Sequence, residues 1–350
     1  MNATRFESLG AYLPPQIVST QELINKMQFT PRFSLERITG IKNRRVCEGE
    51  EDSFVLALEA SRDCLSRSRY RAEDLEVIIS TSITRLKDRT HHYWEPSFAL
   101  LLAKELGADT AIHFDLSNAC AGMMSGILVL DRMIRAGTVK TGMVVSGEYI
   151  TPAALTAVAE MKHTLDHQFA SLTVGDAGAA VILDASLNED DLIHYIEMTT
   201  CSEYSHLCLG QPSDQGGGPA LYTQSHEMQK EDRIQLWPRF QSQLLAQRGT
   251  DFAQEQYDYL IHHQISDRAI QKFSRHGQSL FKTPMPESLS ILAEHGNTAS
   301  TSHFLTLYQL LKTNRLNKRT KFLMVPAASG VVTGCLSVTI SSLKIGSQEP

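Results

Sequence analysis

A single cysteine stands among small residues between two patterned segments of the chain. In FDLSNACAGMM (residues 114–124), Cys120 follows the strand-like pattern IHFDLS and precedes the helix-like pattern AGMMSGILVLDRMIRAG. At a helix N-terminus, backbone N–H groups favour a thiolate over a thiol and can donate to an oxyanion that forms on a bound carbonyl. The small neighbours let a substrate approach the backbone. Taken alone, this placement fits either a nucleophile or a buried cysteine in a tight turn.

Two later segments supply further groups for acyl transfer. IHHQIS offers His262 and His263 near the end of a strand pattern, and EHGNTAS offers Asn297. Histidine can move protons and, when neutral, donate to a carbonyl oxygen, whereas an asparagine amide donates without titrating. Together with a thiolate, these groups make an acyl-transfer set. They lie far apart in the sequence, so only the fold can bring them together, and spacing alone leaves the set suggestive.

Short β-branched runs alternate with helix-period segments, and these elements must position the candidate residues. Strands are predicted in EVIISTSI, AIHFDLS, GMVVSGE, SLTVGDAGAAVILD, YDYLIHHQI, SLSILAE, FLMVPAA and CLSVTI, and helices in SFALLLAKELG, AGMMSGILVLDRMIRAG, ISDRAIQKFSRHG and TSHFLTLYQLLKTNRL. This alternation indicates an α/β fold with largely buried sheets. The polar, glycine-rich segment GQPSDQGGGPALYTQ is typical of a loop or mobile insertion, with a helix expected after it in QSQLLAQRG. We place the junction between two halves near residue 186.

Composition narrows the class of protein. A chain of 350 residues predicts about two domains or two fused halves. The net charge of −6 gives no electrostatic support for nucleic-acid binding. No apolar stretch is long enough to span a membrane and no secretory signal is visible, so a cytoplasmic protein is expected. Six scattered cysteines predict reduced thiols rather than disulfides or a metal site.

Four motifs in chain order resemble those of the β-ketoacyl-acyl-carrier-protein synthase III group of the thiolase superfamily. SNACAGM resembles the family's active-cysteine turn, VGDAGAAVIL the strand after its GD[G/A]AGA turn, HHQIS its histidine-glutamine motif and EHGNTAS its asparagine loop. PAASGVVTGCLSVTI resembles the glycine-rich strand-turn-strand that closes such sequences. The resemblance covers essentially the whole chain. It implies a homodimeric thiolase fold with layers αβαβα, in which residues 1–185 carry the cysteine and residues 186–350 carry the histidine and asparagine.

The same resemblance implies roles for individual residues. Cys120 takes the acyl group, and His263 and Asn297 form the site for the second substrate. The acyl oxyanion hole is made by backbone N–H groups of Cys120 and of Ser329 or Gly330. The substrates are acyl-CoA or acyl-carrier-protein thioesters, and no cofactor is permanently bound.

The chain departs from the family pattern at several places, and three of them concern His262, the closing turn and the segment around Arg37. His262 stands where the family often has proline or an aliphatic residue, and we interpret it as structural. The closing turn reads AASG where three glycines are usual, which predicts a narrower tunnel. In LERITGIKNRR, Ile38 stands where the cofactor-side arginine is expected and Arg37 is displaced by one position. Arg37 is therefore a weak candidate for coenzyme A binding, and an acyl carrier protein is the expected delivery partner.

Glu95, in HHYWEPSFALLLAKELG, is the sharpest departure, because the family usually places an apolar gate residue before this Pro-Ser. A similar Glu-Pro-Ser occurs in the subgroup that joins two acyl chains: the olefin-pathway β-keto-acid synthases and the pyrone or dialkylresorcinol-type ketosynthases. In that resemblance the loop crosses a dimer interface into the partner's acyl pocket, and the glutamate is a base. Desolvation would raise its pKa towards the range that α-proton abstraction requires. The alternative is a carboxylate that only stabilises the N-terminus of the following helix.

The predicted function is therefore a ketosynthase-type Claisen condensation of an acyl group on Cys120 with a second, β-ketoacyl or long-chain, acyl thioester in lipid or polyketide-type biosynthesis. Three alternatives stay open. The first is a decarboxylating synthase that uses a malonyl donor and needs no base. The second is an O- or N-acyltransferase in which His263 is the base. The third is a silent partner subunit or carrier-protein docking module.

Overall fold

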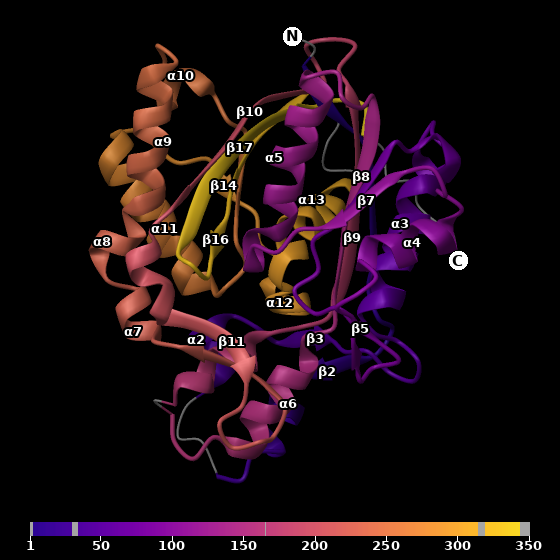
Figure 1. Cartoon of the computed structure of the whole chain (residues 1–350). Helices are drawn as coiled ribbons and strands as arrows, with labels where there is room; N and C mark the ends of the chain where they lie inside the picture. The colour runs from indigo at the N-terminus through magenta and orange to yellow at the C-terminus, as the bar shows by residue number, and fades with distance from the viewer. Residues whose placement is uncertain (1–2, 30–33, 165, 314–318, 344–350) are drawn as a thin grey trace.

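Two β-sheets with two helices packed between them form the centre of the molecule (Figure 1). The computed structural model describes residues 3–29, 34–164, 166–313 and 319–343. Up to residue 185 the strands are β1 (Thr4–Tyr12), β2 (Ile17–Ser19), β3 (Asn43–Arg45), β4 (Val77–Ser80), β5 (Leu86–Lys87), β6 (His91–His92), β7 (Ile112–Asp115), β8 (Thr141–Glu148) and β9 (Ala177–Ala185). The helices there are α1 (Thr20–Asn25), α2 (Leu35–Thr39), α3 (Ser53–Arg67), α4 (Phe98–Leu106), α5 (Gly122–Arg135) and α6 (Thr151–Glu160), with 3-10 turns η1 (Ala72–Asp74), η2 (Ala119–Ala121) and η3 (His167–Thr173).

After residue 185 the chain again forms both strands and helices. Its strands are β10 (Leu192–Thr200), β11 (Cys208–Pro212), β12 (Pro219–Thr223), β13 (Tyr259–His262), β14 (Glu287–Ser288), β15 (Thr320–Val325), β16 (Ala327–Ala328) and β17 (Val332–Ile340). Its helices are α7 (Ser225–Met228), α8 (Glu231–Ile234), α9 (Leu236–Gln247), α10 (Phe252–Glu255), α11 (Asp267–Phe281), α12 (Leu292–His295) and α13 (Ser302–Lys312), with η4 (Ser202–Leu207) and η5 (Ala299–Thr301).

The two main sheets share one pattern of strand pairing. The first has the order β1-β9-β8-β4-β7, and the second β10-β17-β15-β13-β14 with β16 also paired to β17. In each sheet the first two pairings are antiparallel and the last two are parallel. The first sheet uses only strands before residue 186 and the second only strands after it. The two-half division at that residue stays a prediction.

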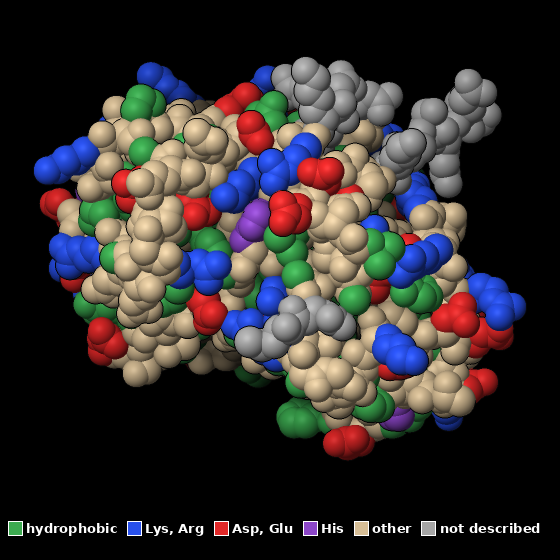
Figure 2. Space-filling model, turned by 90° about the horizontal axis from the view of Figure 1, so that it is seen from above, with side chains coloured by type: hydrophobic (Ala, Val, Ile, Leu, Met, Phe, Trp, Pro, Cys, Tyr) green, Lys and Arg blue, Asp and Glu red, His purple; other side chains and the backbone are tan. Residues whose placement is uncertain are grey.

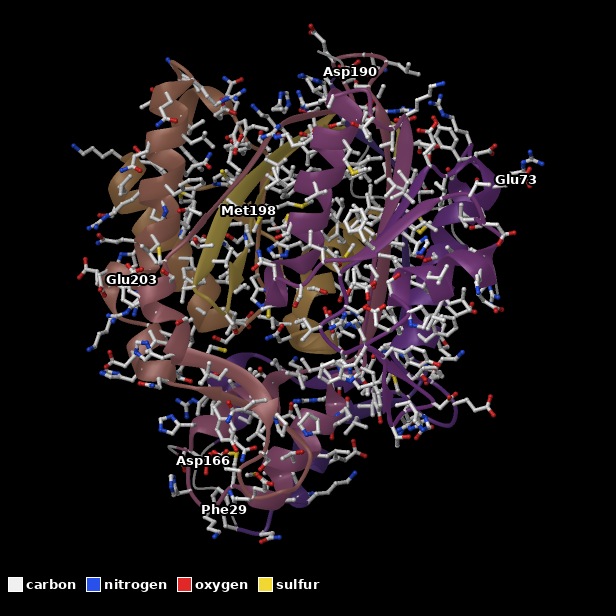
Figure 3. All side chains as sticks on the ribbon, viewed as in Figure 1. Phe29, Glu73, Asp166, Asp190, Met198 and Glu203 are labelled. Carbon is white, nitrogen blue, oxygen red and sulfur yellow. The ribbon has the colours of Figure 1, made fainter. Side chains whose placement is uncertain are left out.

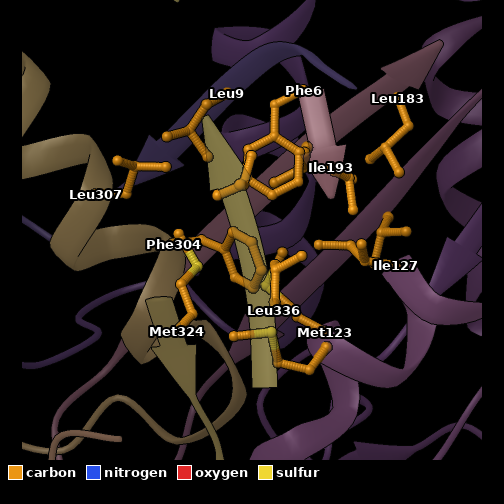
Figure 4. Close-up of a cluster of buried hydrophobic side chains, with 14 of the residues drawn as sticks. Phe6, Leu9, Met123, Ile127, Leu183, Ile193, Phe304, Leu307, Met324 and Leu336 are labelled. Atoms are coloured by element: carbon orange, nitrogen blue, oxygen red, sulfur yellow. The ribbon is translucent and has the colours of Figure 1, made fainter. Parts of the chain in front are cut away.

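The space between the sheets is filled by one hydrophobic core. Met123 from α5 and Phe304 from α13 lie in it with Phe6 of the first sheet and Met324 and Leu336 of the second (Figure 4). Outside the sheets, α3 and α4 cover the first and α9 and α11 cover the second. The expected α/β fold with layered, buried sheets is thereby confirmed.

Two local predictions are wrong. The glycine-rich segment at residues 210–224 lies mostly in the antiparallel hairpin of β11 and β12, because Leu209, Gly210 and Gln211 pair with residues of β12. SLSILAE contributes little to the strand β14 and continues into α12, since Gln264 Oε1 accepts from the Ile291 N–H and ends strand pairing there. The end of the predicted helix at TNRL lies partly outside the described residues.

The surface carries charges of both signs. In the face shown in Figure 2, Lys and Arg side chains alternate with Asp and Glu rather than gathering into one basic field. Within the described part of the chain, no helix combines the length and apolar character needed to cross a bilayer.

Replacing Phe304 by alanine tests the central core. The side chain is fully buried between the sheets, so Phe304→Ala should lower the free energy of unfolding by about 3–5 kcal/mol. Chemical denaturation measures this change. The control is Leu187→Ala at a side chain that is 70% exposed, which should shift stability by less than about 0.5 kcal/mol. Equal, small effects of both substitutions would contradict this packing.

Candidate active site

Cys120 lies in the 3-10 turn η2, which connects β7 to the N-terminus of α5. Ala119 has a positive φ of 47°, and a Cβ on Gly122 would lie 2.8 Å from the Thr81 carbonyl oxygen. Residues larger than these would strain the turn or push it away from the strand end. The sequence therefore holds the thiol at the start of α5, as expected.

Asn297 is fixed between two backbone segments. Its N–H donates to the Thr173 carbonyl at 2.9 Å, and its carbonyl accepts from the Gly175 N–H at 3.0 Å. The side-chain Oδ1 accepts from the Ala299 N–H at 3.0 Å. Because that acceptor is used locally, the amide Nδ2 is the atom left to act as a donor to a bound carbonyl.

Cys120, His263 and Asn297 all line one cavity of about 250 Å³. His263 directly follows β13, and its N–H donates to the Val325 carbonyl at 3.1 Å. The three residues come from η2, the end of β13 and the segment before η5, far apart in the chain. The structure thus brings the predicted acyl-transfer set together.

The charge state of the site differs from the expectation for Cys120. Burial raises the pKa of the Cys120 thiol, and Cys208 and Glu148 raise it further, against a smaller lowering by the backbone N–H of Cys120 itself. Desolvation therefore outweighs the thiolate stabilisation that we predicted from the helix N-terminus. Burial and then the nearby His303 lower the pKa of His263 to about 3, so its ring is neutral at physiological pH. A neutral ring has one N–H to donate to a carbonyl.

The closing turn lies against the cysteine turn. Ala328 and Val332 pack with Cys120 in a small apolar cluster. Met198 of β10 joins this cluster and lies inside the molecule between β17 and α5, whereas Glu203 lies at the periphery (Figure 3). Of the predicted oxyanion-hole residues, Cys120 and Ser329 line the cavity and Gly330 does not.

Arg37 and Glu95 do not reach the cavity of their own chain. Arg37 is exposed on α2, while its neighbours Ile38 and Thr39 line the cavity. Glu95 is exposed in the segment between β6 and α4, next to Trp94, which is 81% exposed. Asp115 anchors the start of α4, which follows that segment, by accepting from the Phe98 and Ala99 N–H groups at 2.8 and 2.9 Å.

Sequence reasoning missed three polar neighbours of the site. His303 of α13 stacks on His263 with ring centroids 5.8 Å apart. Cys208 lines the cavity and accepts a hydrogen bond from Ser329 Oγ at 3.0 Å. Glu148 at the end of β8 is fully buried, and burial raises its pKa. Of these three residues only His303 gave a signal in the sequence, as a histidine in the apolar stretch HFLTLYQLL.

Glu148 ties the end of β8 to the asparagine region through hydrogen bonds. Its Oε1 accepts from Ser300 Oγ at 2.5 Å, Ser146 Oγ at 2.9 Å and the Ile83 N–H at 3.0 Å. Its Oε2 accepts from the Thr84 N–H at 3.3 Å. These bonds join β8, η5 and the segment between β4 and β5. No group of three or more His, Cys, Asp or Glu side chains suited to a metal occurs among the described residues.

Comparison with known proteins identifies the family. The model of the 3-oxoacyl-[acyl-carrier-protein (ACP)] synthase III family matches residues 114–200, and the model of its C-terminal part matches residues 248–340, together more than half of the chain. The chain belongs to this family. Its members are acyl-transferring condensing enzymes of the thiolase superfamily, and this protein is one of them.

Curated relatives match this synthase III along nearly its whole length. The β-ketoacyl-[acyl-carrier-protein] synthase III of Clostridium novyi is 25% identical over 342 residues, covering 95% of this chain and 98% of the relative. The enzyme of the same name from Alkalilimnicola ehrlichii is 28% identical over 344 residues, with the same coverage.

Solved structures show the same fold. A cysteine-to-serine variant of Xanthomonas campestris OleA, with bound lauric acid and lauroyl-CoA, superposes with a TM-score of 0.83 at 21% identity, covering 97% of this chain and 99% of that one. The 3-oxoacyl-[acyl-carrier-protein] synthase III of Aquifex aeolicus gives a TM-score of 0.77 at 22% identity, covering 96% and 100%.

The raised pKa of Cys120 predicts how the reactivity of its thiol changes with pH. Because the thiol is mostly protonated near neutrality, its alkylation rate should rise about tenfold per pH unit from roughly pH 6 to 9 without a plateau. The measurement is iodoacetamide labelling at Cys120 followed by peptide mass mapping. A Cys208→Ala variant serves as the background, because Cys208 is a second thiol in the cavity. A plateau below about pH 8 would instead indicate a thiolate stabilised by the helix N-terminus.

Proposed function

We propose that this synthase III joins two acyl chains by a Claisen condensation in lipid or polyketide-type biosynthesis. The observation that carries this proposal is the convergence of Cys120, His263 and Asn297 on one cavity. This set contains a nucleophile and two carbonyl donors, which are the groups that an acyl-enzyme condensation requires.

In the first half-reaction, the sulfur of Cys120 attacks the carbonyl carbon of an acyl thioester. Backbone N–H groups of Cys120 and of Ser329 or Gly330 hold the oxyanion of the tetrahedral intermediate. The carbon–sulfur bond to the carrier then breaks, and the proton lost by Cys120 ends on the departing carrier thiol. The product is an acyl-Cys120 thioester and no cofactor takes part.

In the second half-reaction, the carbonyl of another acyl thioester binds to the neutral ring of His263 and to Asn297 Nδ2. Removal of a proton from its α-carbon gives an enolate, whose negative oxygen these two donors stabilise. The α-carbon attacks the acyl-Cys120 carbonyl, a carbon–carbon bond forms, and the Cys120 sulfur leaves and is reprotonated. The product is a β-ketoacyl thioester.

We assign the removal of the α-proton to Glu95 of the partner subunit in a homodimer. Support comes from its position: Glu95 is exposed outside its own cavity and lies next to the exposed Trp94. Ile112, which is 50% exposed on the edge strand β7, adds an apolar surface to the same half of the chain. Pairing of two copies through such a surface would take the carboxylate out of water and place it against the partner's cavity, as abstraction of an α-proton requires.

The carrier of the acyl groups is proposed to be an acyl carrier protein. The relatives are named for such a carrier, and Arg37 is exposed away from the cavity rather than placed to hold coenzyme A. Arg233 and Lys272, which line the cavity, are cations that can meet the phosphate of a carrier's pantetheine arm. We expect the enzyme to act in the cytoplasm.

A decarboxylating reaction with a malonyl donor is the second candidate, because the curated relatives carry the name of that synthase. Loss of CO₂ would then generate the enolate, and no base would be needed. The two reactions differ in whether Glu95 is required.

Cys120→Ala tests the nucleophile. Incubation with an acyl thioester should add one acyl mass to the wild-type protein and none to this variant, because the acyl group is carried on the Cys120 sulfur. Intact-protein mass spectrometry reads the adduct. The matched control is Cys208→Ala, which removes the other thiol of the cavity and should keep the adduct. An adduct that persists in Cys120→Ala, or its absence from the wild type across chain lengths, would contradict the assignment.

Glu95→Gln tests the base. The variant keeps the size of the side chain and removes its ability to take a proton, so it should form the acyl-Cys120 adduct at the wild-type rate. Condensation of non-malonyl acyl thioesters should fall by at least about 100-fold. Product mass spectrometry measures this loss, and a malonyl donor given to the same variant is the internal control. Full product formation from non-malonyl donors would overturn the role of Glu95.

A further inference from the structure

His262 and His263 are neighbours in the sequence but face opposite sides of the second sheet. His263 stacks on His303, which belongs to the helix between the sheets. His262, the last residue of β13, faces the outer helices, with its ring 5.2 Å from Trp237 of α9 and 5.7 Å from Phe273 of α11. Because side chains alternate along a strand, this separation follows from the backbone. His262 therefore has surroundings distinct from those of the catalytic set.

The polar atoms of this pair have no protein partner. Both ring nitrogens of His262 and the Nε1 of Trp237 make no hydrogen bond to the described residues, although the side chains are only 1% and 3% exposed. An unsatisfied buried polar atom is costly to the folded state. His303, which is also fully buried, does find a partner, because its Nε2 contacts the Val325 carbonyl. A histidine kept only for packing would be expected to do the same.

The two residues that carry these unpartnered atoms line the substrate cavity. His262 and Trp237 line the same cavity as Cys120, together with the apolar side chains of Ile234, Ala269 and Phe273. Burial lowers the pKa of His262 to about 3, so the neutral ring offers one donor and one acceptor nitrogen. The indole adds a second donor. His262 and Trp237 thus present two donors and one acceptor beside these apolar side chains.

Gly277 allows α11 to pack closely against the indole of Trp237. A Cβ on Gly277 of α11 would lie 2.9 Å and 3.0 Å from two ring atoms of Trp237. The close approach of α11 leaves the six-membered ring of the indole in contact with the helix backbone. Trp237 is thereby packed from the helix side, and its orientation next to His262 is set by the fold.

We propose that His262 and Trp237 form a subsite that binds a keto or hydroxyl oxygen carried on an acyl chain beyond its thioester carbonyl. A keto oxygen accepts from the indole N–H and from the protonated ring nitrogen of His262. A hydroxyl can instead accept from the indole N–H and donate to the unprotonated ring nitrogen. The surrounding apolar side chains contact the methylene groups. This subsite rests on the proposed chain-joining function and narrows its substrate class to oxygenated acyl chains.

Binding measurements on Cys120→Ala protein test the subsite without turnover. The probes are dodecanoyl pantetheine and its oxo and hydroxy isomers, with the oxygen placed at successive carbons. Isothermal titration should show at least one oxygenated isomer binding about tenfold more tightly than the saturated chain. If no isomer exceeds the saturated chain, the pair holds only water and the proposal is overturned.

Further variants, made in Cys120→Ala protein, show which side chains cause the preference for an oxygenated chain. His262→Phe keeps a ring against Trp237 and removes both nitrogens, so it should abolish the tenfold preference, measured as the ratio of the oxygenated-chain affinity to the saturated-chain affinity of the same variant. His262→Asn restores a donor and an acceptor and should recover part of it. Phe273→Leu is the matched control, since it alters an apolar wall and should change the affinity of all probes alike. Retention of the full preference in His262→Phe would overturn the role of His262.

The comparison of probes on Cys120→Ala protein needs no variant at the subsite, so it holds even if His262→Phe fails to fold. Trp237→Phe gives a second substitution that should reduce the preference. Failure of the subsite is distinguishable from failure of the proposed function. If saturated acyl thioesters bind and load Cys120 of the wild type but oxygenated chains gain nothing, only the subsite is wrong. If no acyl thioester binds or loads Cys120, both are wrong.

Discussion

The burial of α5 and α13 between two sheets is the constraint on which the active site depends. Both helices are packed on two faces, so their positions are set by the tightly filled core around Met123 and Phe304. Each helix follows a 3-10 turn, η2 or η5, and these two turns contact one another. The thiol at the start of one helix and the amide just before the other therefore arrive at one end of the central layer. Catalytic geometry is here a consequence of core packing.

Polar groups at that end are stabilised by the same burial. The carboxylate of Glu148 is removed from water, and its hydrogen bonds to Ser146, Ser300 and Ile83 offset part of the desolvation cost. Burial also keeps His263 neutral. A neutral donor pair suits a carbonyl and its enolate, whereas a charged ring in the same place would cost more to bury. The site thus combines a protonated thiol with uncharged donors in a mostly apolar cavity.

Much of the fold follows from patterns that the sequence displays. The buried runs EVIISTSI and GMVVSGE and the helix pattern after Cys120 all form the expected elements, because their hydrophobic periodicity matches the layer that each occupies. The hairpin at residues 208–223 was missed, since glycine and proline cluster at its turn and conceal the short strands on each side.

The site itself was only partly predictable. Convergence of Cys120, His263 and Asn297 came from family resemblance rather than from spacing, because contacts between distant segments leave no local pattern. His262 shows the limit most clearly. Its position on a strand is evident from the sequence, but whether its nitrogens find partners depends on side chains of α9 and α11 that no motif links to it. The proposed reach of Glu95 into a second copy of the chain is a matter of assembly, which one sequence does not reveal.

The central claim is that this synthase III makes its enolate by proton removal rather than by decarboxylation. The most direct measurement is product mass spectrometry on the wild-type enzyme supplied with one long-chain acyl thioester alone, and in parallel with a malonyl thioester labelled in its free carboxyl carbon. The account predicts a β-ketoacyl product built from two copies of the acyl chain when no malonyl donor is present. A product that forms only with the malonyl donor, with the label released as CO₂, would contradict it.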